Sequence, residues 1–206
     1  MKHIFIPVIS NFEIADKEIN EISRKLPKKI AIAYSVQYKN SALKIKNRLK
    51  NHIITGFSQV LGCSKPQFSK DTEAILLVSS GRFHAVSLAL ETNLPIYIYD
   101  RKLSRISEKE IDDLRKKKKS AYLKFLNAEK IGIIISTKPG QENLQRALKL
   151  KESLKSKNSY LFIGNEINPR EFENFSISSW VNTACPRLDF DFPVINLGEI
   201  RKISDI

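Results

Sequence analysis

The sequence predicts an α/β fold made of two similar small domains, each a parallel β-sheet flanked by helices. Three observations lead to this prediction. The chain of 206 residues has room for two domains of about 100 residues each. One pattern of apolar runs and helical segments occurs twice along it. The apolar runs are continuous in Ile, Val and Leu, which is typical of parallel strands buried on both faces.

The first copy of the pattern begins with an apolar, β-rich run over Lys28–Tyr38. A helical segment over Asn40–Asn51 follows, and then a short strand, "HIITG", at 52–56. A third strand is predicted within Glu73–Arg82, and a fourth in "LPIYIYD" at 94–100. Each strand is short and bounded by polar or turn-forming residues, as in α/β domains.

The second copy repeats this order from "KIGIIISTKPGQ" at Lys130–Gln141. Its helix is predicted over Glu142–Lys157, and three further strands within 159–165, Ser178–Arg187 and 192–198. The helix has apolar residues at helical spacing and a basic outer face. The apolar positions are Leu144, Ala147, Leu148, Leu150 and Leu154.

A long helix over Ser107–Lys130 is predicted to join the two domains. Ser107 is a suitable N-cap, and Glu110 three residues later completes a capping box. We therefore expect a first domain over 1–106, with a short N-terminal remnant, and a second over 107–206, with the linking helix at about 107–129.

The chain is strongly basic, with 35 Lys and Arg against 22 Asp and Glu and a net charge of +13. Such a charge is compatible with an RNA or ribosome-associated partner. However, Lys outnumbers Arg, and Asn and Ile are abundant, which is typical of an A/T-rich coding bias. The run Lys116–Lys119 falls in the predicted helix and is interpreted as a solvated face. A nucleic-acid partner is therefore not expected.

The cysteine content and the hydropathy of the sequence indicate the cellular compartment of the protein. No run of about 20 apolar residues occurs, so no membrane-spanning segment is predicted. The N-terminal "MKHIFIPVIS" has neither a long apolar region nor a small-residue cleavage site, so no signal peptide is expected. Two cysteines do not form a disulfide framework. We expect a cytoplasmic protein whose thiols are kept for metal binding or chemistry.

Polar residues follow four of the predicted strands, at 35–38, 79–84, 136–141 and 182–187. In open parallel sheets, ligands bind outside the carboxyl ends of the strands. These four segments together are therefore the candidate site.

Several residues in these segments suit an anionic ligand. Gly81 and Gly140 permit tight turns and close approach of a ligand, although either can be an ordinary loop glycine. Arg82 could bind a carboxylate or phosphate in a bidentate way, and Lys138 could do so as a point charge. His84 is interpreted as a structural histidine rather than a ligand or base. No catalytic residue is assigned.

The cysteines are Cys63, in a loop after Gly62, and Cys185, between a predicted strand and Pro186. No CxxC cluster is present, so neither a zinc ribbon nor the usual radical-enzyme loop is encoded. An isolated cysteine often only packs. Here the flanking Gly62 and Pro186 restrict the backbone, and Arg187 could stabilise a thiolate. Two thiolates alone would hold an iron–sulfur cluster poorly.

In five segments the chain resembles the archaeal diphthamide-synthesis enzymes, which transfer a 3-amino-3-carboxypropyl group to translation elongation factor 2. The segments occur in the family's order and cover most of residues 28–198. They are "VQY" at Val36, "GCSKP" at Gly62, "GRFHAVSLALETNLPIYIYD" at Gly81, "TKPGQ" at Thr137 and "NTACPR" at Asn182.

The resemblance implies an iron–sulfur enzyme. Members of the family have three similar α/β domains, and each gives one cysteine to a central [4Fe-4S] cluster. The open iron binds the substrate S-adenosylmethionine, and the reduced cluster cleaves its sulfur–Cγ bond before the group reaches a histidine of elongation factor 2. By position, Cys63 resembles the metal ligand of the middle domain and Cys185 that of the last. The remaining cofactor-binding candidates, from their chemistry and location, are Gln37, Gly81, Arg82, Lys138, Gln141 and Arg187.

The chain also departs from the family. It is expected to begin where the first domain of the family ends, so that this domain and its cysteine are absent and the tail after Ile200 is shortened. One hypothesis is a subunit of a split enzyme, with a separate chain supplying the third cysteine. A second is a non-catalytic accessory partner of a full-length homologue. A third is a diverged basic module that binds RNA, although no aromatic-rich strand of the RNA-binding type is evident.

Overall fold

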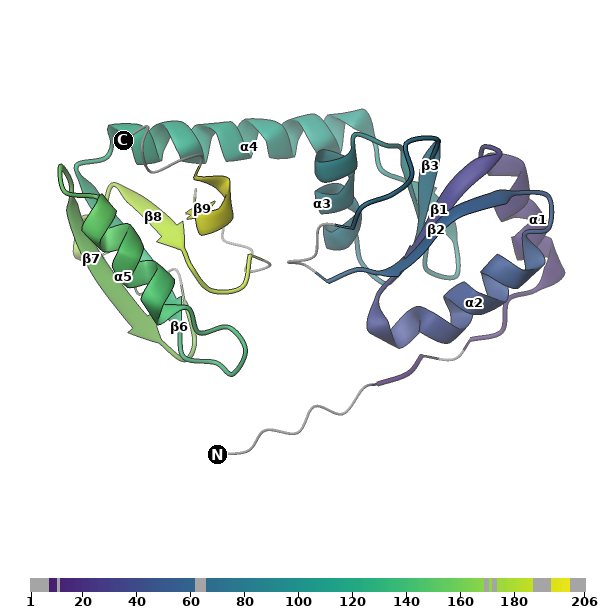
Figure 1. Cartoon of the computed structure of the whole chain (residues 1–206), viewed down its shortest axis with the longest axis horizontal. Coiled ribbons are helices and arrows are strands. Elements are labelled where there is room, and N and C mark those ends of the chain that lie inside the picture. The colour runs from purple at the N-terminus through teal and green to yellow at the C-terminus, as the bar shows by residue number, and fades with distance from the viewer. Residues whose placement is uncertain are drawn as a thin grey trace. The chain divides into compact units, whose positions relative to one another are not determined.

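The fold is α/β and contains two parallel sheets with flanking helices, as the sequence predicted. This computed structural model describes residues 8–10, 12–61, 66–168, 171, 174–186 and 194–200. The chain divides into two compact units, Met1–Asp112 and Asp113–Ile206. The division falls inside the long helix α4, Glu108–Asn127 (Figure 1).

The sheet of the first unit has the strand order β2-β1-β3-β4-β5. The parallel strands are β1 (Lys29–Tyr34), β2 (Ile53–Gln59), β3 (Ala74–Val78) and β4 (Ile96–Tyr99). The fifth, β5 (Leu103–Arg105), runs antiparallel to β4 and was not predicted. All but the first residue of β1 and all of β3 are buried, which explains their continuous apolar sequences.

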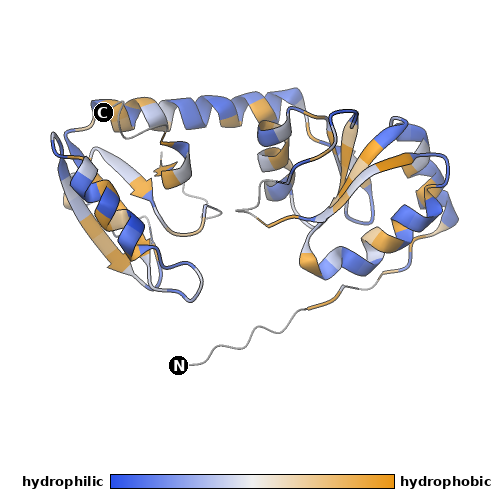
Figure 2. Cartoon of the chain, viewed as in Figure 1, coloured by the Kyte–Doolittle hydropathy of each residue, from blue (hydrophilic) through white to orange (hydrophobic). Residues whose placement is uncertain are grey.

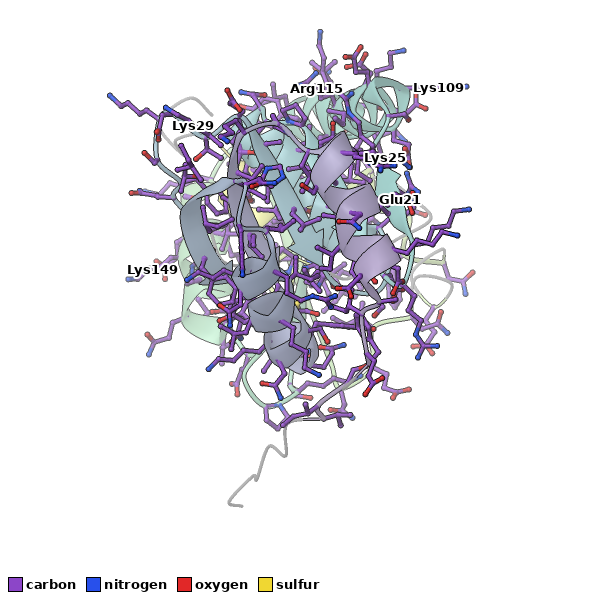
Figure 3. All side chains as sticks on the ribbon, turned by 90° about the vertical axis from the view of Figure 1, so that its right-hand side faces the viewer. Glu21, Lys25, Lys29, Lys109, Arg115 and Lys149 are labelled. Carbon is purple, nitrogen blue, oxygen red and sulfur yellow. The ribbon has the colours of Figure 1, made fainter. Side chains whose placement is uncertain are left out.

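Helices cover both faces of this sheet. α1 (Asp16–Lys25) and α2 (Lys39–Arg48) pack on one face, and α3 (Phe83–Thr92) on the other. α1 was not predicted; its inner face buries isoleucines, while its outer face carries ion pairs. Figure 3 shows one of these, in which Lys25 Nζ lies 2.7 Å from Glu21 Oε1 one turn earlier.

The sheet of the second unit repeats the order of the first four strands, as β7-β6-β8-β9. Its strands are β6 (Lys130–Ser136), β7 (Asn158–Gly164), β8 (Ser179–Asn182) and β9 (Val194–Asn196), and all are parallel. β6 thus corresponds to β1 and β8 to β3. The internal repeat predicted from the sequence is therefore present in both sheets.

α5 (Leu144–Ser153) and the C-terminal part of α4 pack against the sheet of the second unit. Ala147, Leu150 and Leu154 point into the core. The predicted apolar face was too wide, because Leu144 and Leu148 are 37% and 41% exposed. One residue step turns a helix by about 100°, which directs Leu148 away from the face that Ala147 shares with the core.

The middle of α4 is hydrophilic (Figure 2). The lysines of the run 116–119 are all exposed, as expected for a solvated face. In the described part of the chain, no helix is both long enough and apolar enough to cross a membrane.

Candidate functional site

At the carboxyl edge of the first sheet, the ends of β1 and β3 lie side by side, with Tyr34 paired to Val78. Gln37 follows β1 in a single 3-10 turn, Val36–Tyr38, and is half-buried. The nearby Ser35 hydroxyl is buried and has no hydrogen-bond partner among the described residues. Such a hydroxyl could serve a bound ligand. Polar groups therefore lie at this edge of the sheet, in the segment that the sequence predicted.

Gly81 and Arg82 lie at the same edge, between β3 and α3. Gly81 has a φ of 78°, a left-handed conformation that glycine adopts without strain. The Arg82 guanidinium makes a bidentate ion pair with Glu110, in which Nε and Nη2 each donate at 2.8 Å. Glu110 also accepts hydrogen bonds from the backbone N–H and the hydroxyl of Ser107. The predicted capping box is therefore present, and its Glu110 carboxylate also binds the Arg82 guanidinium.

These contacts lower the pKa of Glu110 to about 2 from its ordinary 4.5, through the Ser107 N–H, the Ser107 hydroxyl and Arg82. The ionised form is therefore favoured in the folded protein, so stability from this group is present above about pH 4.5 and is lost as the pH falls towards 2. We expect Glu110→Gln to lower the free energy of unfolding at neutral pH by up to about 1 kcal/mol, since the side chain is 37% exposed and screened.

Urea unfolding at several pH values measures this effect. The difference between wild type and Glu110→Gln should shrink as the pH falls below 4.5. Glu108→Gln is the matched control, because Glu108 is an acidic residue of the same first turn without a described contact to Ser107 or Arg82. A difference that is independent of pH would contradict the prediction.

The carboxyl edge of the second sheet carries Lys138 and Gln141 in the loop after β6. The loop is closed by a hydrogen bond from the Gln141 N–H to the Lys138 carbonyl at 3.0 Å. The Lys138 N–H donates to the Ser136 hydroxyl at 3.1 Å, and Gly140 has a φ of 76°. Lys138 Nζ lies 3.9 Å from Glu166, an exposed and long contact that leaves the ammonium accessible.

Cys185 lies three residues after the end of β8, as a free and half-buried thiol. Its loop is joined to the loop after β6, because the Asn143 amide donates to the Thr183 carbonyl at 2.9 Å. Lys138, Gln141 and Cys185 therefore belong to two neighbouring loops at one edge of the second sheet. A thiolate with an ammonium and an amide in the adjoining loop is suited to a metal centre that also holds an anionic ligand.

Two predicted site residues, Cys63 and Arg187, lie outside the described residues, so their roles stay predictions. Among the residues that are described, no group of three or more His, Cys, Asp or Glu side chains could hold a metal ion. Sequence reasoning missed Asn143 and Glu110 as residues of the site, and it included Asn182 in the predicted segment 182–187 without giving it a role. The polar "NT" at the end of an apolar strand was the available signal for Asn182.

The family model of diphthamide synthesis proteins matches residues 1–202. The chain belongs to this family. The chain is 28% identical over 204 residues to the 2-(3-amino-3-carboxypropyl)histidine synthase of Pyrococcus horikoshii, covering 91% of this chain and 59% of that protein. It is 30% identical over 207 residues to the synthase of Methanocaldococcus jannaschii, covering 93% of this chain and 57% of that protein.

Solved structures agree with the family assignment. The crystal structure of Dph2 from Pyrococcus horikoshii matches with a TM-score of 0.74 and 28% identity, covering 89% of this chain and 59% of that one. A crystal structure of the same protein with a 4Fe-4S cluster matches with the same TM-score, the same coverage and 30% identity. The chain thus spans less than two thirds of the length of these relatives.

A eukaryotic relative, subunit 1 of the synthase of Yarrowia lipolytica, is 30% identical over 184 residues, covering 80% of this chain and 41% of that protein. The name of that relative describes a subunit.

Proposed function

We propose that this chain is one subunit of a [4Fe-4S] enzyme that transfers the 3-amino-3-carboxypropyl group of S-adenosylmethionine to a histidine of translation elongation factor 2. This is the first step of diphthamide synthesis, in the cytoplasm. The observation that carries the proposal is the free, half-buried thiol of Cys185 at a carboxyl sheet edge. The family match over residues 1–202 and the synthase relatives support it.

Thiolates are the donors that iron–sulfur clusters take, so the chemistry of Cys185 fits this cofactor. Cys63 and Cys185 are the two cysteines of the sequence. They would be two of the ligands of the cluster, and a separate chain would supply the third. When bound, the reduced cluster supplies the electron that cleaves the sulfur–Cγ bond of S-adenosylmethionine.

The other candidate residues of this chain hold the substrate. Lys138 Nζ is accessible in the loop beside that of Cys185, so it is placed to attract the carboxylate of the aminocarboxypropyl group. The half-buried Gln141 amide can donate to the same group. In the first unit, Gln37 and Arg82 lie at the carboxyl edge of that unit's own sheet, and Glu110 keeps the Arg82 guanidinium in one orientation. Arg187 is the remaining cofactor-binding candidate that was predicted from the sequence.

Two measurements test the proposal. The chain is co-expressed with a polypeptide of the same organism that matches the part of the relatives that this chain does not span, and the complex is purified without oxygen. We expect about four iron atoms per complex. We also expect the histidine of elongation factor 2 to gain the mass of the group when S-adenosylmethionine and dithionite are added. A complex without iron overturns the proposal.

A second candidate function is an accessory subunit that assists a homologue holding a cluster of its own. It is favoured by the name of the Yarrowia lipolytica relative, which describes one subunit of a synthase. The double variant Cys63→Ser, Cys185→Ser separates the two functions. The accessory function predicts that the variant complex keeps its activity, whereas the proposed function predicts that it loses it.

A further inference from the structure

Asn182 is the last residue of β8, and its side chain is almost fully buried, at 1% exposure. Its amide nitrogen donates to the carbonyl of Cys185 and to Oδ1 of Asn196, each at 2.9 Å. Its oxygen accepts the N–H of Ala184, also at 2.9 Å. Both protons of the amide are therefore used, and both go to fixed acceptors.

Two of these three hydrogen bonds end on the backbone of the turn that carries Cys185. They hold the N–H of Ala184 and the carbonyl of Cys185 against the buried Asn182 side chain. These two hydrogen bonds fix the backbone of the turn at Ala184 and at Cys185. The thiol itself takes no part in this network, so it stays available as a donor.

The position of Asn182 is in turn set by its neighbours. Asn196 is its register partner on β9. The Asn196 N–H donates to Glu199 at 3.1 Å, and the other carboxylate oxygen of Glu199 lies 2.7 Å from Lys118 Nζ on α4. On the other side, the Thr183 hydroxyl donates to the Ile134 carbonyl at 2.8 Å. The turn is thereby tied to β6, to β9 and to α4.

We infer that Asn182 is a positioning residue for Cys185 as a cluster ligand, an inference that rests on the proposed function. A cluster binds tightly only when its thiolates are already held in the geometry that it requires. Asparagine suits this position because one side chain must donate twice and accept once. Aspartate would place an oxygen against two other oxygens, and alanine would remove the Asn182 partner from three polar groups that are partly or fully buried.

The inference is tested with the full chain, anaerobically reconstituted with ferrous iron, sulfide and β-mercaptoethanol, whose thiolate stands in for the missing third ligand. Iron content and the visible absorption of the cluster are measured for wild type, Asn182→Ala and Asn182→Asp. Losing such an orienting partner typically weakens metal binding by roughly 10–100-fold. We expect both variants to need at least about tenfold more iron for half-loading.

Thr55→Val, on β2, is the matched control, because it removes a part-buried hydrogen bond between the Thr55 and Thr72 hydroxyls and none of the bonds of the Cys185 turn. It should lower the melting temperature but leave iron loading unchanged. If Asn182→Ala does not fold, Asn196→Ala carries the test, since it removes a single bond to Asn182 from a less buried position.

The outcomes distinguish the positioning role of Asn182 from the proposed function of the chain. If wild type loads iron and the Asn182 variants load it equally well, the positioning role is wrong and the proposed function stands. If wild type does not load iron with any thiol or partner chain, the proposed function fails and the inference fails with it. Reduced loading in the Asn182 variants, but not in Thr55→Val, supports both.

Discussion

Cys185→Ser is expected to remove nearly all iron from the complex and with it the transfer activity. Serine is close to cysteine in size but is a poor ligand for iron at neutral pH, because its hydroxyl keeps its proton. A cluster held by three thiolates would then be left with two. The change should leave the fold intact, since the thiol is half-buried and makes no disulfide in the described structure.

Iron and sulfide are counted in complexes purified without oxygen, and thermal unfolding of the same preparations shows whether the variant is folded. Cys63→Ser should give the same loss of iron as Cys185→Ser. Iron content equal to that of wild type in the Cys185 variant would show that this thiol is not a ligand. The accessory function would then be favoured.

Gly132→Ala is expected to destabilise the second unit strongly. Gly132 on β6 is the register partner of Trp180 on β8. A Cβ atom at Gly132 would lie 2.3 Å from two carbons of the indole ring, far inside van der Waals contact. The ring has little freedom to move, because it is 6% exposed and packs edge-on against Phe162 with centroids 4.7 Å apart. Overpacking of this kind typically costs about 1–3 kcal/mol or more.

Urea unfolding of the variant, followed by the far-UV circular dichroism of the backbone, measures this cost. Gly198→Ala is the control, because a Cβ atom there has no atom within 4 Å and the residue lacks a positive φ. Trp180→Phe in the Gly132→Ala background should recover part of the stability by making room. An unfolding midpoint of Gly132→Ala equal to that of wild type would contradict the packing of the indole on Gly132.

The local pattern of apolar and polar residues correctly predicted the class of fold and the strands of its core. The continuous apolar runs of β1 and β3 predicted buried parallel strands, because a strand covered on both faces has no polar side. The pattern failed on α5, where Leu148 is exposed. The helical periodicity includes every apolar residue near one face of the helix, whether or not that residue contacts the sheet. The periodicity alone therefore does not predict how wide the buried face of the helix is.

The sequence by itself determined the repeated α/β plan and placed Cys185, Lys138 and Arg82 after the strands that carry them. Only the tertiary structure decided how these residues are held. Arg82 is bound by Glu110, which is 28 positions away in the chain, and Asn182 by Asn196, which is 14 away. Such contacts depend on which strands pair and in which register. A one-residue shift in register would turn each side chain to the opposite face.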